Sequence, residues 1–170
     1  LYFSLFCIYK CINNRNNKSI SRPTQFLFAC AFILGLTGAF QGIFTPDWTN
    51  IYNFLGILCG QLQHSLIILN VLWLIFAYGL RIYFKDCIQS YIFVNILVFP
   101  ALLLNYFLGT NAQGLPANYL YVNALPDVSN PLLNLISSQP FPWFILYIQP
   151  IIIIYIIILY IPFKILNYYK

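Results

Sequence analysis

The sequence contains very few charged residues. Lys, Arg, Asp and Glu together make up 6% of its 170 residues, whereas soluble domains carry about 25%. Glu and Met are absent, and there is a single His. Hydrophobic residues account for 61% of the chain, which is more apolar surface than a soluble core could bury. These absences predict an integral membrane protein.

Other missing patterns exclude further classes of function. The cysteines form no CxxC pair and there is no second His to join them, so we expect neither a metal site nor a disulfide framework, and no cofactor. The net charge of +5 is scattered, and no basic run alternates with aromatics, which argues against nucleic-acid binding. Because Met is absent, we do not expect Leu1 to be the true start. The five cysteines are Cys7, Cys11, Cys30, Cys59 and Cys87.

Apolar stretches long enough to cross a bilayer recur along the chain. About 20 residues at about 1.5 Å rise cover the roughly 30 Å hydrocarbon core. We predict an all-α, polytopic transmembrane helix bundle that forms one integral membrane domain over residues 1–170. It has five membrane segments, the first of them truncated, and a long outer loop. The expected helices cover about 1–12, 23–44, 52–80, 87–108 and 142–164, and the loop covers 110–139.

Small residues recur at helical spacing on the second expected helix. Gly35, Gly38 and Gly42 lie on it, with Ala31 before them and Ala39 between the last two. Such a stripe lets neighbouring membrane helices approach closely, so we expect this helix to pack against a partner.

The cations indicate an orientation. All eight Lys and Arg residues fall on one side if the helices alternate, while the two opposite loops hold only Asp47 and Asp127. The positive-inside rule then places the basic side in the cytoplasm or its equivalent. The loop 110–139 is expected on the opposite face.

A polar hexapeptide, Gly60-Gln61-Leu62-Gln63-His64-Ser65, interrupts the third apolar stretch. His64 is therefore expected near the middle of the membrane. An ionisable side chain at that depth costs at least a few kcal/mol unless it faces a polar cavity or a partner, which makes it a functional candidate. The alternative is a neutral histidine that joins two helices by a hydrogen bond, at about 0.6 to 2 kcal/mol.

Polar side chains on three other expected helices fall at a depth similar to that of His64. At about 1.5 Å per residue, all lie roughly 21 to 27 Å from the basic side. They suggest either one shared polar cavity or separate interhelical hydrogen bonds. We expect Gln61, one turn before His64, to belong to the same group. The candidate cavity residues are Thr37, Gln41, Gln61, Asn105 and Gln149.

Four segments in order resemble a known family. They read GLTGAFQGIFTPDW, QLQHSLIIL, NYLYVNALPDVSNPLLNLISSQPFPWFILYIQP and LYIPF, and they span Arg22 to Phe163. They resemble the YwaF-like integral membrane proteins, whose pattern includes an animal transmembrane ether-phospholipid acyltransferase. The resemblance implies that His64 matches the family's intramembrane histidine. It also implies that Asn118 and Tyr119 match a loop motif, and that Pro140, Pro142 and Trp143 match the motif at the start of the last helix.

The resemblance further implies a cysteine on an earlier helix that carries the acyl group while the histidine activates it. Cys7 is the candidate by sequence order. It lies only about 7 Å into the membrane, some 16 Å short of the depth of His64. Either the nucleophile lies upstream of Leu1, or Cys7 is displaced, or this member is not catalytic. Gln149 stands where the resemblance implies a Glu in bacterial relatives.

Two classes of function follow. The first is an acyltransferase or related lipid-modifying enzyme with His64 as base, whose partners are the lipid bilayer and a phospholipid or acyl-chain substrate. The second is a non-catalytic membrane scaffold or assembly subunit that uses its polar residues only for packing. A transporter has less support, because no inverted repeat is evident.

The predicted topology can be tested by labelling. Cysteines introduced at Lys18 and at Asp127 should react with an impermeant reagent from opposite faces of sealed vesicles. Reaction of both from one face would rule out the five-segment topology.

Overall fold

The computed structural model describes residues 20–46, 53–110, 114–126 and 130–168. Within these ranges the secondary structure is helical, without a named strand. Four segments are long and apolar enough to cross a membrane: α2 (Arg22–Phe44), α3 (Phe54–Tyr78), α4 (Phe84–Leu108) and Phe144–Leu166. The predicted all-α, polytopic class is confirmed, and the chain is an integral membrane protein. The expected first segment, 1–12, lies outside the described residues.

The last span is composed of two helices, α6 (Phe144–Tyr147) and α7 (Gln149–Tyr168). Two further short elements, η2 (Tyr119–Tyr121) and α5 (Pro131–Asn134), lie between α4 and α6. The chain divides into two compact units. Unit 1 comprises residues 1–90 and 155–170, and unit 2 comprises residues 91–154, so that α4 and α7 contribute to both.

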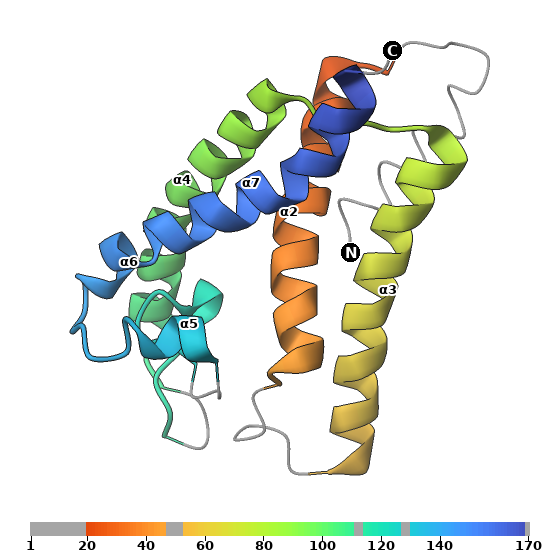
Figure 1. Cartoon of the computed structure of the whole chain (residues 1–170). Coiled ribbons are helices and arrows are strands. Elements are labelled where there is room, and N and C mark those ends of the chain that lie inside the picture. Colours follow the sequence, from red (N-terminus) through yellow and green to blue (C-terminus); the bar gives the residue numbers. More distant parts are fainter. Residues whose placement is uncertain (1–19, 47–52, 111–113, 127–129, 169–170) are drawn as a thin grey trace. The chain divides into compact units, whose positions relative to one another are not determined.

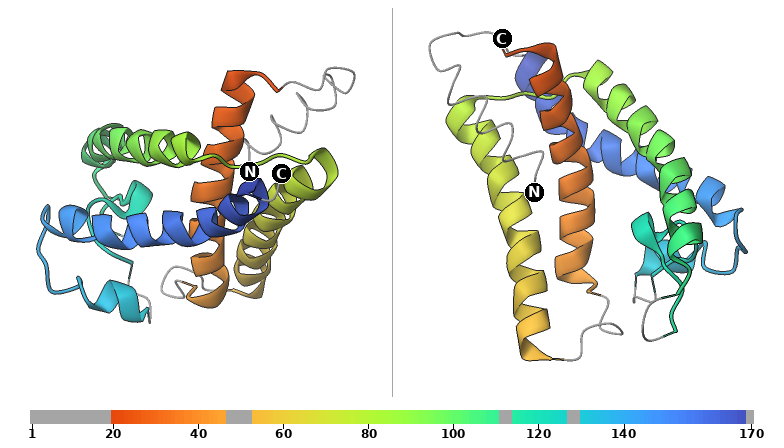
Figure 2. Two further views of the ribbon diagram at one scale, coloured as in Figure 1. Left: turned by 45° about the horizontal axis from the view of Figure 1, so that its top comes forward. Right: turned by 180° about the vertical axis from the view of Figure 1, so that it is seen from behind.

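In unit 1, α2 and α3 run side by side in opposite directions (Figures 1 and 2). A Cβ added at Gly35 would lie 3.0 Å from a methyl carbon of Ile67 and 3.8 Å from one of Val71, so this glycine faces α3 closely. A Cβ added at Gly38 would meet nothing within 4 Å. The predicted close helix contact is present, and Gly38 does not take part in it.

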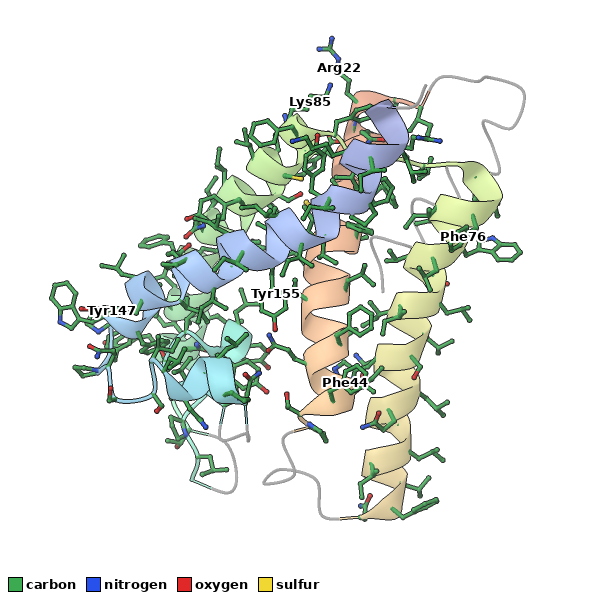
Figure 3. All side chains as sticks on the ribbon, viewed as in Figure 1. Arg22, Phe44, Phe76, Lys85, Tyr147 and Tyr155 are labelled. Atoms are coloured by element: carbon green, nitrogen blue, oxygen red, sulfur yellow. The ribbon has the colours of Figure 1, made fainter. Side chains whose placement is uncertain are left out.

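Much of the α3 surface is exposed in the described part of the chain. Only Val71 and Leu74 of its 25 residues are buried. Phe76 is 81% exposed and points away from α2 in Figure 3. An apolar helix surface of this extent, in a chain that spans a membrane, is suited to contact with lipid.

Local hydrogen bonds set the helix ends. Ser21 caps α2, since its hydroxyl accepts from the N–H of Thr24. Gly79, with a φ of 66°, closes α3 two residues before the expected end at 80. α4 begins at Phe84 instead of the expected 87, because the Asp86 carboxylate accepts the N–H of Tyr83 at 3.0 Å. An acidic side chain that reaches back to the residue preceding the first turn stabilises a helix start.

Asp86 also joins two helices of unit 1. Gln25 of α2 donates through Nε2 to the Asp86 carboxylate at 2.7 Å and to the carbonyl of Arg81 at 2.8 Å. Asp86 is only 1% exposed. A buried carboxylate costs free energy unless it is hydrogen-bonded, and Asp86 accepts from the side chain of Gln25 and from the N–H of Tyr83. Sequence reasoning missed this residue, although a lone acid at the start of an apolar run is a helix-capping signal.

In unit 2, the expected outer loop is largely folded. The Ala117 N–H donates to the Gly109 carbonyl at 2.8 Å, and Asn130 caps α5 through its side chain. Within the described part of the loop, Val122, Leu133 and Ile136 are buried. The described part of the loop therefore buries apolar side chains within unit 2.

The final span is interrupted at Ile148, between α6 and α7. Pro150 has no N–H and cannot donate to the preceding turn, which accounts for the interruption. The helices begin at Phe144 and continue to Tyr168, compared with the expected 142–164.

Replacement of Asp86 tests the contact that starts α4. Asp86→Ala leaves the N–H of Tyr83 without its acceptor, and should lower the free energy of unfolding by about 1 to 3 kcal/mol. The measurement is thermal unfolding in detergent, with the exposed neighbour variant Lys85→Ala as control. An equal Tm for both variants would contradict a stabilising role for Asp86.

Candidate functional site

His64 lies in the middle of α3 and is half-buried. Its Nδ1 is 2.7 Å from the carbonyl oxygen of Gly60, one turn earlier on the same helix. A carbonyl oxygen only accepts hydrogen bonds, so Nδ1 must carry the hydrogen. In the neutral ring Nε2 then has the lone pair.

The imidazole contacts α2 at Gly42. A Cβ added at Gly42 would overlap Nε2 and Cδ2 of the ring and would lie 2.7 Å from Cε1. The added carbon would thus be at similar distances from all three ring atoms. If it lay in the plane of the ring, beyond Nε2, it would be clearly farther from Cδ2 and Cε1 than from Nε2. Gly42 therefore packs against the flat face of the ring, above Nε2.

Gly42 does not lie in the direction of the Nε2 lone pair. The lone pair lies in the ring plane, and Gly42 covers a face of the ring. Among the described residues, the one hydrogen bond of the His64 side chain is that to Gly60. In the described part of the chain, the ring therefore has one nitrogen that is hydrogen-bonded and one that is not.

The other candidate residues of unit 1 lie near this ring in sequence or on its partner helix. Gln41 precedes Gly42 on α2, and Gln61 lies three residues before His64 on α3; both are partly buried. The Thr37 hydroxyl donates to the carbonyl of Ile33 at 2.7 Å, within its own helix. The partner of Nδ1 is the Gly60 carbonyl, a backbone group that the sequence does not reveal.

The cysteines of the described residues do not approach His64. Cys30 is buried, 3.8 Å from the Ser90 hydroxyl, and Cys87 is buried beside Asp86. Cys59 is exposed on α3, and five residues at about 100° each place it on roughly the opposite side of the helix from His64. Cys7 lies outside the described residues. Within the described ranges no cluster of His, Cys, Asp and Glu is suited to hold a metal ion.

Asn105 belongs to unit 2 and bonds to the loop that follows α4. Its Oδ1 accepts the N–H of Tyr119 at 2.7 Å, and its Nδ2 donates to the carbonyl of Tyr119 at 3.2 Å. The side chain is only 3% exposed. Both backbone groups of one loop residue are therefore satisfied by one buried amide on α4.

The loop motif at Asn118 and Tyr119 is stabilised by a second amide. Asn118 accepts the N–H groups of Asn123 and Ala124 at 3.0 and 3.2 Å, and donates to the carbonyl of Ala124 at 2.8 Å. Leu120 and Tyr121 have φ values of 56° and 52°. Left-handed backbone at a residue other than glycine costs about 1 to 3 kcal/mol, and the Asn105 and Asn118 hydrogen bonds offset that cost.

Both polar atoms of the Gln149 side chain form hydrogen bonds within unit 2. Its Oε1 accepts the Tyr91 hydroxyl at 2.9 Å, and its Nε2 donates to the carbonyl of Ile145 at 2.9 Å. The amide thereby joins α4 to α6 at the break before Pro150. Sequence reasoning missed Tyr91, which has no motif around it.

The residues of the motif at the start of the last helix form a turn. The Trp143 N–H donates to the carbonyl of Pro140 at 2.8 Å, and Phe141 packs near Phe144 with ring centroids 6.4 Å apart. Pro140, Pro142 and Trp143 are exposed. They shape the approach to α6 and present an aromatic side chain at its start.

Substitution of Asn105 tests its hold on the loop. Asn105→Ala removes both partners of Tyr119, so backbone amides of 117–124 should exchange hydrogen faster, by roughly tenfold for each 1.4 kcal/mol lost. Asn95→Ala is the matched control, because Asn95 bonds only the carbonyl of Tyr91 in its own helix. Equal exchange in the two variants would show that Asn105 does not order the loop.

Comparison with known proteins gives one result. The TMEM164 family matches residues 2–160, nearly the whole chain. No curated protein matches it, and no solved structure does. The likeness to YwaF-like proteins stays a resemblance. Because the match includes both Gly42 and His64 and far more than half of the sequence, this chain belongs to the TMEM164 family.

Proposed function

We propose that this protein is a membrane enzyme that transfers acyl chains to or from phospholipids, with His64 as its general base. The observation that carries the proposal is the hydrogen bond from Nδ1 of His64 to the Gly60 carbonyl. It holds the ring in one orientation and leaves Nε2 to accept a proton. A general base needs both properties.

In the proposed step, Nε2 takes the proton of a thiol or hydroxyl nucleophile as that group attacks the ester carbonyl of a phospholipid. The tetrahedral intermediate then expels the lysophospholipid oxygen, which receives the proton from the imidazolium. A second transfer moves the acyl group to the acceptor lipid. Cys7 remains a candidate nucleophile from the family resemblance.

A lipid substrate would approach α3 from the bilayer. Leu62 and Leu66 are 53% and 47% exposed and suit contact with acyl chains. Two residues at about 100° each place both leucines on roughly the opposite side of α3 from His64, so they are a lipid-facing surface and not part of the site.

A second function is favoured by other observations. Asn105 and Gln149 each form a hydrogen bond to a residue outside their own helix. Such bonds support a scaffold in which polar residues serve packing alone. For His64 the support is weaker, because its hydrogen bond lies within α3, whereas a histidine that joins helices would bond to another helix.

The proposed orientation places the basic side in the cytoplasm. Among the described residues, Arg22 begins α2, Lys85 lies in the first turn of α4, and Lys164 lies near the end of α7. Arg22 and Lys85 lie at the same end of unit 1 (Figure 3). Their agreement with the positive-inside rule supports this sidedness.

Two substitutions of His64 test the enzyme proposal. His64→Ala removes the base and should reduce phospholipid acyl transfer by about 10²- to 10⁴-fold, with normal membrane insertion. His64→Gln retains a hydrogen-bonding side chain but cannot carry a proton through the cycle, so it should be equally inactive. The measurement is transfer of a labelled acyl chain between phospholipids by full-length protein in liposomes.

The exposed variant Gln63→Ala is the control and should keep wild-type activity. If His64→Gln transfers acyl chains at the wild-type rate, His64 is not the base. If wild-type protein transfers none and His64→Ala merely fails to assemble, the scaffold function is correct.

A further inference from the structure

We propose that Gly42 is a positioning residue for His64: the missing side chain at Gly42 lets the imidazole lie flat on α2 with Nδ1 bonded to Gly60. That the positioned ring serves catalysis rests on the proposed function. That Gly42 positions the ring rests only on the contacts between Gly42 and His64. It adds to the proposed base a residue on a second helix that sets the ring's orientation.

Two contacts fix the ring. The hydrogen bond from Nδ1 to the Gly60 carbonyl limits rotation of the imidazole about its side-chain bonds. The close approach of Gly42 limits how far the plane of the ring can tilt toward α2. A real Cβ essentially never approaches another atom within 3.0 Å, and one at Gly42 would lie that close to Nε2, Cδ2 and Cε1. With alanine at position 42 the ring must turn away.

The ring cannot turn while it keeps its hydrogen bond undisturbed. Rotation of the side chain moves Nδ1 off the Gly60 carbonyl, and hydrogen bonds weaken steeply as their angle departs from linear. Once that bond is lost, nothing selects Nδ1 over Nε2 as the hydrogen-bearing nitrogen. The lone pair that serves as base would then be present on Nε2 in only part of the molecules.

The three glycines of α2 provide a matched series. An added Cβ at Gly35 touches Ile67 and Val71, one at Gly38 touches nothing within 4 Å, and one at Gly42 overlaps the imidazole. All three variants replace glycine by the better helix former, so helix propensity does not distinguish them. Gly35→Ala controls for altered helix spacing, and Gly38→Ala controls for the substitution itself.

The first readout is the nitrogen NMR spectrum of ¹⁵N-histidine-labelled protein. Because the 170 residues contain a single His, the ring signals of this chain belong to His64. Wild type, Gly35→Ala and Gly38→Ala should show a protonated Nδ1 and an unprotonated Nε2. Gly42→Ala should show averaged or altered signals, and acyl transfer about 100-fold slower, the typical effect of a 1 Å displacement in a catalytic site.

The second readout is a double-mutant cycle on thermal stability. Gly42→Ala should lower Tm in the wild-type background. In a His64→Ala background, where the ring is gone, the same substitution should leave Tm unchanged or raise it. This cycle keeps the inference testable even if Gly42→Ala alone folds poorly.

The outcomes separate this inference from the proposed function. Unchanged ring signals in Gly42→Ala, or an equal loss of Tm in both backgrounds, would overturn the positioning role, while inactivity of His64→Gln would still support the base. Altered signals with full activity of His64→Gln would support the positioning role and reject the base. Altered signals together with slow transfer only in Gly42→Ala would support both.

Discussion

The need to satisfy polar groups within the chain governs this structure. Water is excluded from the interior of the helix packing, so an unpaired buried polar group costs several kcal/mol. Asp86 meets this need by accepting from Gln25 and from the backbone of Tyr83. Asn105 meets it by pairing with both backbone groups of Tyr119. The Asp86 bonds lie at the start of α4, and the Asn105 bonds join α4 to the loop that follows it. The bonds that satisfy these buried polar groups therefore also connect neighbouring parts of the fold.

The membrane helices could be predicted from the sequence because length and hydropathy determine them. Their ends were less predictable, since these depend on individual side chains. α4 starts three residues earlier than expected because Asp86 caps it, and the last span is broken because Pro150 lacks an N–H. Asp86 and Pro150 are both visible in the sequence. A prediction that uses only the length of an apolar stretch does not take them into account.

The candidate site was predictable in part. His64 stands out as the only histidine in an apolar stretch, and Gly42 belongs to a visible stripe of small residues. Their contact could not be predicted, because it depends on which face of α2 meets α3 and on the register of the two helices. Gly38 belongs to the same stripe of small residues, yet a Cβ added there would meet nothing within 4 Å. Membership of the stripe therefore does not predict which glycine contacts α3.

The hydrogen bonds of His64 differ from those of the amides of Gln149 and Asn105. Gln149 uses both ends of its amide to join α4 and α6, and Asn105 does the same for α4 and the loop. His64 instead bonds its own helix through one nitrogen and meets α2 only through its ring face. A side chain retained for packing alone would gain more from a bond between helices. An imidazole oriented on one nitrogen and unbonded on the other is the arrangement that proton transfer requires.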